Sequence, residues 1–233
     1  MIQVRDLALE FRAGEDRVVA LAGVDLDVPR GAYVALLGPS GSGKTSLLHL
    51  LGGLERPTRG SVRVGGLDLG TASDASLAEF RNRRVGFVFQ SFHLDGQRTA
   101  LENVVLPLYF GPLPVARGRA RARELLARVG LEGLQDRPVG CLSGGQRQRV
   151  AVARALVCEP DLLLADEPVG HLDDETARSV LDLLAELHRE RGLTLVATTH
   201  EGRLVRHAGR VVELRAGRLV ADTPGEEVPS RAR

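Results

Sequence analysis

The chain has 233 residues, a formal net charge of +1 at pH 7, and only 3% aromatic residues. This length fits one domain, or one domain that carries an inserted lobe. The near-zero net charge and the shortage of aromatic rings disfavour a surface built to bind nucleic acid. The N-terminus lacks a signal-peptide pattern, and no apolar run approaches the roughly 20 residues that a membrane helix needs. We therefore expect a soluble, cytoplasmic protein that reaches a membrane only through a partner.

In chain order, the first predicted elements are strands. Residues 2–9 and 18–28 show apolar residues at alternating positions, which predicts half-buried antiparallel strands. Residues 33–38, YVALLG, are apolar on both faces, as buried parallel strands are. A helical pattern over residues 45–54 follows, and residues 59–69 return to short strands with glycine turns.

Further along the chain, strands and helices alternate. Buried strands are predicted within 84–90, 161–168 and 193–200, and the last two each follow a helical segment. This alternation predicts an α/β fold with a mainly parallel sheet, joined to an N-terminal antiparallel β subdomain. A mainly helical stretch from about 91 to 159 interrupts the alternation and is interpreted as an inserted helical subdomain. We place the domain at residues 1–222 and expect the tail 223–233 to be mobile.

A basic segment, ARGRARARELLARVG, lies inside the helical stretch. It could form a nucleic-acid patch, or it could be a solvated helix face with its leucines turned inward. The near-zero charge of the whole chain favours the solvated face. We therefore expect Leu125, Leu126 and Val129 to be buried and no nucleic acid to bind.

Residues 38–45, GPSGSGKT, fit the phosphate-loop pattern G-x-x-x-x-G-K-[ST] between a buried strand and a helix. Gly41 and Gly43 allow the backbone to curl so that its N–H groups form an anion nest. Lys44 is the only lysine in the chain, and we expect it to span the β- and γ-phosphates. Its compact ammonium group fits inside such a nest, whereas a wide guanidinium fork should not. Thr45 offers a hydroxyl group to Mg²⁺. An ordinary Gly/Ser turn is disfavoured, because both flanking elements also fit.

Polar side chains end three of the buried strands. Asp166 and Glu167 follow four apolar residues, and ligands of parallel sheets bind at the carboxyl ends of strands. Asp166 is placed to hold Mg²⁺, and Glu167 to polarise the attacking water as a general base. His200 can donate to the γ-phosphate, although a lone histidine is more often structural. Gln90 can reach both the metal and a water. The other five histidines show no such context, and we expect no catalytic role for them.

A second glycine turn precedes another predicted helix in the stretch CLSGGQRQRVAVARAL. Ser143, Gly144 and Gly145 at a helix N-terminus make either a second anion site or an ordinary N-cap.

Taken together, these motifs resemble the ATP-binding subunit of an ABC transporter. The phosphate loop, VFQ, LSGGQ, LLLADEP, GHLD and TTH occur in that family's order, and the resemblance runs from Met1 to about Asp222. Within the family, the chain is most similar to subunits of the lipoprotein-releasing and macrolide-export type, in the stretch FRAGEDRVVALAGVDLDV, in DEPVGHLD and in TALENVVLPL. The resemblance implies the P-loop NTPase fold and ATP hydrolysis coupled to transport.

The resemblance also implies roles for individual residues. It implies that Phe11 stacks on adenine, that Glu167 is the catalytic base and that His200 is the switch residue, with Lys44 and Gln90 assisting. The implied phosphate contacts are Gly38, Pro39, Ser40, Gly41, Ser42, Gly43, Lys44, Thr45 and Ser46. The implied Mg²⁺ ligands are Thr45, Gln90 and Asp166. Ser143, Gly144, Gly145 and Gln146 would contact the γ-phosphate held by a second copy of the chain, with Asp173 at the seam. The implied partners are that second copy, in a head-to-tail ATP sandwich, and an integral membrane permease that holds the chain at the inner face of the cell membrane.

The sequence departs from that type at several positions. Val169 and His171 replace Thr and Asn, and Asp95-Gly96-Gln97 replaces Leu-Leu-Pro near the expected contact with the membrane partner. Glu201 follows the switch histidine in place of Asp, and Cys141, which we expect to be packed, replaces a polar residue. Because no catalytic group is lost, we still expect hydrolysis.

Two other functions stay open at this point. A soluble ABC-type ATPase acting on DNA or ribosomes is disfavoured, because the sequence shows no coiled-coil insertion, zinc motif or second cassette. A degenerate module that binds ATP without turnover is disfavoured by the presence of Glu167 and His200.

Overall fold

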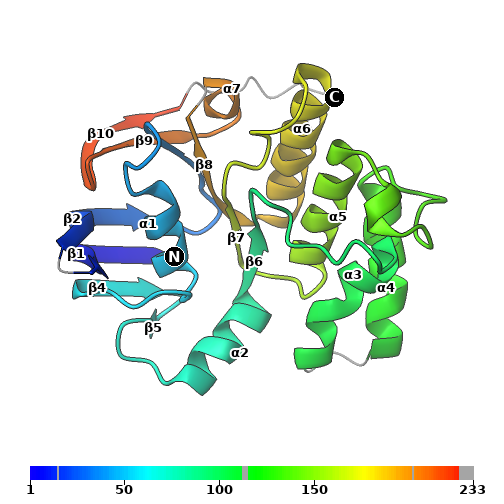
Figure 1. The fold of residues 1–233 in the computed structure, drawn as a ribbon, viewed down its shortest axis with the longest axis horizontal. Helices are drawn as coiled ribbons and strands as arrows, with labels where there is room; N and C mark the ends of the chain where they lie inside the picture. The colour runs from blue at the N-terminus through cyan, green and yellow to red at the C-terminus, as the bar shows by residue number, and fades with distance from the viewer. Residues whose placement is uncertain (15, 112–114, 201, 226–233) are drawn as a thin grey trace.

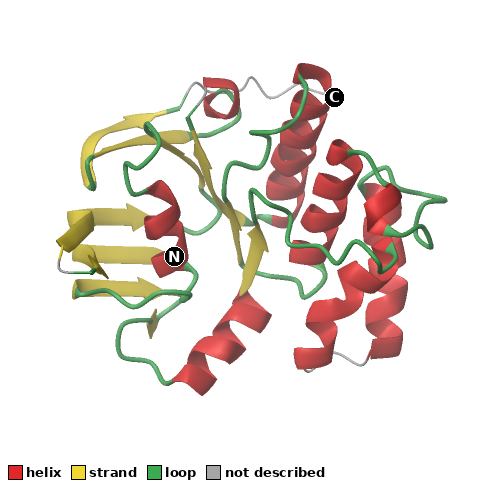
Figure 2. Cartoon of the chain, viewed as in Figure 1, coloured by secondary structure: helices red, strands yellow, loops and turns green. Residues whose placement is uncertain are grey.

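A computed structural model describes residues 1–14, 16–111, 115–200 and 202–225 of the protein (Figure 1). Glu201, one of the departures noted in the sequence, and the tail from residue 226 lie outside the described residues. Two sheets organise the fold, and helices cover the larger one (Figure 2). The predicted α/β class is therefore confirmed.

The N-terminal sheet is antiparallel. Its strands, in the spatial order β2-β1-β4-β5, are β1 (Ile2–Ala13), β2 (Asp16–Val28), β4 (Arg59–Val64) and β5 (Leu67–Asp68). Ile2, Val4, Leu7 and Leu9 are all buried on this sheet, as their alternation predicts. Backbone irregularities between Val4 and Leu7 let the alternation skip a residue without losing the core face.

The larger sheet is mainly parallel, as predicted. Its spatial order is β10-β9-β3-β8-β7-β6, and only the β10–β9 pair is antiparallel. The bounds are β3 (Tyr33–Leu37), β6 (Val85–Val88), β7 (Leu162–Ala165), β8 (Thr194–Thr199), β9 (Arg210–Arg215) and β10 (Arg218–Pro224). The end of β10 corrects one expectation. Residues 223 and 224, assigned to the mobile tail, extend this strand because Thr223 and Pro224 pair with β9.

The central strands divide the core into two layers. Along β3, Val34 and Leu36 pack into the cluster that contains α1 (Lys44–Leu51) and the N-terminal sheet. Tyr33 and Ala35 point to the opposite cluster, with α5 (Gly144–Leu156) and α6 (Asp174–Arg191). This period-two alternation explains why the strands read as apolar on both faces.

The helical stretch lies mainly on the α5 side of the sheet. Besides α5, it contains α3 (Ala100–Val105), the 3₁₀ turn η1 (Leu106–Phe110), α4 (Val115–Arg128) and the 3₁₀ turn η2 (Val139–Cys141). Leu125, Leu126 and Val129 are buried, so the basic segment has the predicted inward face. The remaining helices are α2 (Asp74–Arg84), which runs into β6, and the short α7 (Gly202–Val205).

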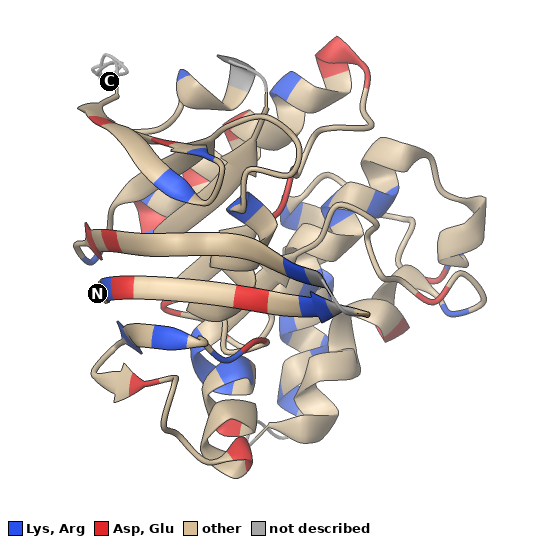
Figure 3. Cartoon of the chain, turned by 60° about the vertical axis from the view of Figure 1, so that its left-hand side comes forward, with Lys and Arg blue, Asp and Glu red and all other residues tan. Residues whose placement is uncertain are grey.

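Charged residues of both signs are scattered over the molecule in the view of Figure 3. Arg121 pairs with Glu159, and Arg128 pairs with Glu190, so part of the basic segment is neutralised locally. None of the helices within the described residues is both long and apolar enough to cross a membrane. Cys141 is exposed, so the expectation that it is packed is wrong.

Candidate functional site

The predicted phosphate loop has the backbone shape that its glycines allow. Gly41 and Gly43 have φ values of 77° and 100°, in the left-handed region that favours glycine. Gly43 is the N-cap of α1 and offers no side-chain cap, and no acidic residue lies in the first turn of that helix. The first N–H groups of α1 therefore face the loop without a side-chain acceptor, as an anion site requires.

Two segments that are distant from the loop in sequence pack closely against it. A Cβ atom at Gly38 would overlap the carbonyl oxygen of Leu214 on β9. A Cβ atom at Gly43 would lie 2.5 Å from the carbonyl oxygen of Ala20 on β2. Both glycines are therefore required by close packing, and the loop is held between the two sheets.

Lys44 is 5% exposed and points into the loop that precedes it. Its Nζ donates hydrogen bonds to the carbonyl oxygens of Gly38 (2.8 Å) and Pro39 (2.9 Å). Among the described residues, no carboxylate lies within ion-pair distance of this ammonium group. A buried cation bound only to neutral acceptors leaves its charge available to an anionic ligand.

Asp166 connects the loop to the ends of β7 and β8. Thr45 Oγ1 donates to Asp166 Oδ2 at 2.9 Å, and Thr198 Oγ1 donates to Asp166 Oδ1 at 2.6 Å. The backbone N–H of Glu167 donates to Thr198 Oγ1 at 2.9 Å. The structure thus brings Thr45, Asp166 and Glu167 together as predicted. Thr198 was missed, although a threonine inside a buried strand was the available signal.

Glu167 occupies an unusual backbone conformation next to this cluster. Its φ is 43°, which is strained for a residue with a side chain. The side chain is mostly buried and has two polar neighbours from other strand ends. Gln90 Nε2 donates to its Oε2 at 3.3 Å, and His200 Nδ1 lies 3.2 Å from its Oε1. The three residues predicted from three strand ends therefore meet at one carboxylate.

His171, one of the five histidines for which we expect no catalytic role, lies next to the site. Its Nε2 lies 3.4 Å from Gln90 Nε2, within hydrogen-bond distance. It sits in the segment between β7 and α6, four residues after Glu167.

The second glycine turn forms the N-terminus of α5 and is capped by its own residues. Gln146 N donates to Ser143 Oγ at 3.3 Å, and Ser143 N donates to Gln146 Oε1 at 2.9 Å. This reciprocal pair is a capping box. A Cβ atom at Gly145 would overlap Thr176 of α6, so the two helix N-termini are closely packed.

Asp173 caps α6 beside this turn. Its Oδ1 accepts a hydrogen bond from Thr176 N at 2.9 Å. These hydrogen bonds to the carboxylate lower the pKa of Asp173 below its usual value. Ser143, Gly144, Gly145, Gln146 and Asp173 therefore form one group, on the side of the larger sheet opposite α1 (Figure 1).

Phe11 lies on β1 and is 40% exposed, so its ring is accessible. It pairs with Val18 on β2, two residues before Ala20, the residue whose carbonyl oxygen abuts Gly43. This register places Phe11 beside the part of β2 that packs against the phosphate loop.

Comparison with known proteins identifies the family to which the chain belongs. A sequence profile for the family described as ABC transporter matches residues 21–170. The chain belongs to the ABC transporter family.

Individual relatives agree. The chain is 50% identical over 222 residues to the lipoprotein-releasing system ATP-binding protein LolD of Geobacter metallireducens. This match covers 95% of this chain and 99% of that protein. It is 44% identical over 228 residues to the macrolide export ATP-binding/permease protein MacB of Rhodopirellula baltica, covering 95% of this chain but 33% of that protein.

A solved structure gives the same result. The dimeric, post-hydrolysis structure of the ATP-binding cassette MJ0796, bound to ADP and Pi, matches with a TM-score of 0.89 at 37% identity. The match covers 96% of this chain and 98% of that chain. This ABC protein is accordingly an ATP-binding, ATP-hydrolysing subunit of a transporter, and the alternatives of a DNA- or ribosome-directed ATPase and of an inactive module are set aside.

The side chains of this ABC cassette fit both a nucleotide phosphate and Mg²⁺. The hydroxyl group of Ser42 in the phosphate loop is buried and has no hydrogen-bond partner among the described residues. A Cβ atom at Gly41 would meet nothing within 4 Å, so the loop is open on that side. Thr45, Asp166 and Gln90 supply hydroxyl, carboxylate and amide oxygens, the hard donors that Mg²⁺ prefers.

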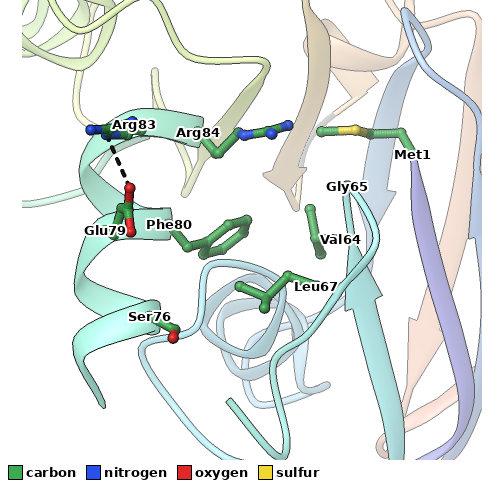
Figure 4. A pocket seen from close by; sticks show the side chains of 9 residues that line it. All are labelled: Met1, Val64, Gly65, Leu67, Ser76, Glu79, Phe80, Arg83 and Arg84. Carbon is green, nitrogen blue, oxygen red and sulfur yellow. Dashed lines mark ion pairs between the residues drawn. The ribbon is translucent and has the colours of Figure 1, made fainter. Parts of the chain in front are cut away.

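A separate cavity of about 310 Å³ lies between α2 and the β4–β5 hairpin (Figure 4). Phe80, Val64 and Leu67 supply much of its apolar wall. Its two arginines are already paired, Arg83 with Glu79 and Arg84 with Asp161. No residue predicted for the nucleotide lines this cavity, so it is distinct from the ATP site of the cassette.

Proposed function

We propose that this subunit works as a pair, in which each ATP lies between the phosphate loop of one copy and the Ser143 turn of the other. The observation that carries this proposal is the placement of the two glycine turns. They begin helices on opposite sides of the sheet, so a second copy supplies the second turn to each phosphate. The dimeric form of the similar cassette MJ0796 supports the same arrangement.

Within each site, the residues divide the work of hydrolysis. The loop from Gly38 to Ser46 holds the phosphates, with Lys44 on the β- and γ-phosphates and Phe11 against adenine. Glu167 accepts a proton from the attacking water, and His200 and Gln90 orient its carboxylate through the contacts at 3.2 and 3.3 Å. Mg²⁺, held by Thr45, Asp166 and Gln90, would neutralise negative charge on the phosphates.

The partner of the pair is an integral membrane permease. The similarity to LolD and to the ATP-binding part of MacB supports a transporter of the lipoprotein-releasing or macrolide-export type. The subunit would then sit on the cytoplasmic face of the cell membrane through that permease. Closing on ATP and reopening after hydrolysis would move the permease.

The decisive experiment replaces the general base. Glu167→Gln keeps the shape of the side chain but cannot take the proton, so turnover should fall by about 10²- to 10⁴-fold. The variant should accumulate as an ATP-bound dimer in size-exclusion chromatography with ATP and Mg²⁺. Glu124→Gln, an exposed change on α4, is the matched control and should hydrolyse ATP normally. A Glu167→Gln protein that stays monomeric in excess ATP would count against the paired site.

A further inference from the structure

His171 stands where subunits of the lipoprotein-releasing and macrolide-export type have asparagine. The roles proposed above for the hydrolysis of ATP do not involve this residue. Its side chain does not contact the carboxylate of Glu167 directly; Gln90 lies between the two and contacts both. Gln90 is the only side chain that comes within hydrogen-bond distance of the His171 ring among the described residues. Gln90 in turn contacts Glu167.

The contact with Glu167 fixes which end of the Gln90 amide faces the site. An ionised carboxylate only accepts hydrogen bonds, so the amide atom 3.3 Å from Glu167 Oε2 must be the nitrogen. The same nitrogen lies 3.4 Å from His171 Nε2. Because that nitrogen is a donor, His171 Nε2 must be the acceptor, and the ring proton lies on Nδ1.

Both N–H bonds of the Gln90 amide are then engaged, one by Glu167 and one by His171. The amide cannot rotate by half a turn without placing its oxygen against the Glu167 carboxylate, which accepts hydrogen bonds and donates none, and without losing its present contact with His171 Nε2. Its oxygen is therefore held facing away from Glu167 and His171, free for another ligand.

We infer that His171 is a positioning residue that holds the amide of Gln90 with its oxygen free to coordinate Mg²⁺. This inference rests on the proposed role of Gln90 as a metal ligand. His171 does not itself touch nucleotide or metal. Its effect passes through Gln90, so a change at His171 should matter only while Gln90 is present.

The test measures how Mg²⁺ promotes binding of a fluorescent, non-hydrolysable ATP analogue, which requires no turnover. His171→Leu removes the acceptor and should raise the half-saturating Mg²⁺ concentration by about three- to ten-fold, the worth of one hydrogen bond. His171→Gln places an amide oxygen near the position of Nε2 and should restore the wild-type value. His171→Asn carries its amide nearer the position of Nδ1 and should not restore it. His207→Leu, far from Gln90 in sequence and paired with Asp182, is the control and should behave as wild type.

A double-mutant cycle separates positioning from a general structural effect. In a Gln90→Ala background, His171→Leu should cause no further change in the Mg²⁺ dependence. At saturating Mg²⁺, kcat and the KM for ATP of His171→Leu should return toward the wild-type values, because the metal site is then filled. Thermal unfolding of each variant identifies any that fails to fold. If His171→Leu does not fold, His171→Gln is compared with the wild type instead.

The outcomes are distinct. If Gln90→Ala changes the Mg²⁺ dependence but His171→Leu does not, or if the two effects multiply, the inference about His171 is wrong and the role of Gln90 stands. If Gln90→Ala leaves the Mg²⁺ dependence unchanged, the metal-ligand role fails and the inference falls with it.

Discussion

The phosphate loop before α1 and the serine–glycine turn before α5 have similar compositions and different structures. Before α1, Gly41 and Gly43 adopt left-handed conformations and no side chain caps the helix. Before α5, Ser143 and Gln146 close a capping box, and neither Gly144 nor Gly145 has a positive φ. One helix end is left open, whereas the other satisfies some of its own N–H groups.

This difference in capping fits the two different tasks that the proposed paired site gives to the two turns. An uncapped N-terminus with a buried lysine gains most from an anion, so it can hold nucleotide in a single subunit. A self-capped N-terminus is stable without a ligand, and in the proposed pair it would meet the phosphate held by the other copy. The comparison yields four predictions, ordered by expected effect.

Lys44→Arg should have the largest effect, because it fills the open turn with a planar fork. We expect ATP affinity to fall by about 100-fold, the upper range for losing a charge-assisted hydrogen bond. Fluorescent nucleotide titration of the monomer checks this, with the exposed Arg56→Lys as a control. Wild-type-like affinity in Lys44→Arg would contradict the shape argument.

Gly43→Ala and Gly144→Ala form a matched pair. An alanine at position 43 needs a φ of 100° and meets Ala20 O at 2.5 Å, so unfolding free energy should drop by about 2 kcal/mol. An alanine at position 144 meets only Leu172 Cδ2 at 3.6 Å and should change stability by less than about 1 kcal/mol. Chemical denaturation measures both. Equal losses would show that the two turns are not structurally different.

Ser143→Arg should separate turnover from binding. A bulky side chain at the proposed seam should slow hydrolysis about ten-fold or more, in line with the cost of overpacking a close contact. Nucleotide affinity of the monomer should stay within two-fold, about the scatter of a surface change. If steady-state hydrolysis persists at the wild-type rate, the second turn does not complete the site.

Phe11→Ala should have the smallest effect. The ring is exposed beside the part of β2 that packs against the phosphate loop, so its loss should weaken ATP binding about five-fold, the lower range for base stacking. The Mg²⁺ dependence should be unchanged. Exposed Phe110→Ala, on η1, is the control. Equal affinity in Phe11→Ala and wild type would remove Phe11 from the site.

Local features were the ones that the sequence predicted well. The left-handed glycines of the phosphate loop, the start of a helix directly after Ser143 and the acidic pair after β7 follow from residues close together in the chain. The order of motifs then identified the family, and with it the fold.

Contacts between distant residues could not be predicted in the same way. Thr198 reaches Asp166 and His171 reaches Gln90 only because parallel strands end at one edge of the sheet. The end of β10 was missed because Thr223 and Pro224 have weak strand signals, and pairing with β9 overrides them. The exposure of Cys141 depends on how η2 packs, which no local pattern reports.

The packing of Gly38 and Gly43 bears on how small a working version of this protein can be made. The family profile spans residues 21–170, yet the two carbonyl groups that shape the phosphate loop belong to Ala20 and Leu214, outside that span. A fragment limited to residues 21–170 would keep the sequence motif of the phosphate loop but would lose the carbonyl groups of Ala20 and Leu214 that pack against it. Boundaries for truncation, permutation or fusion should therefore be drawn around β2 and β9 rather than around the motifs.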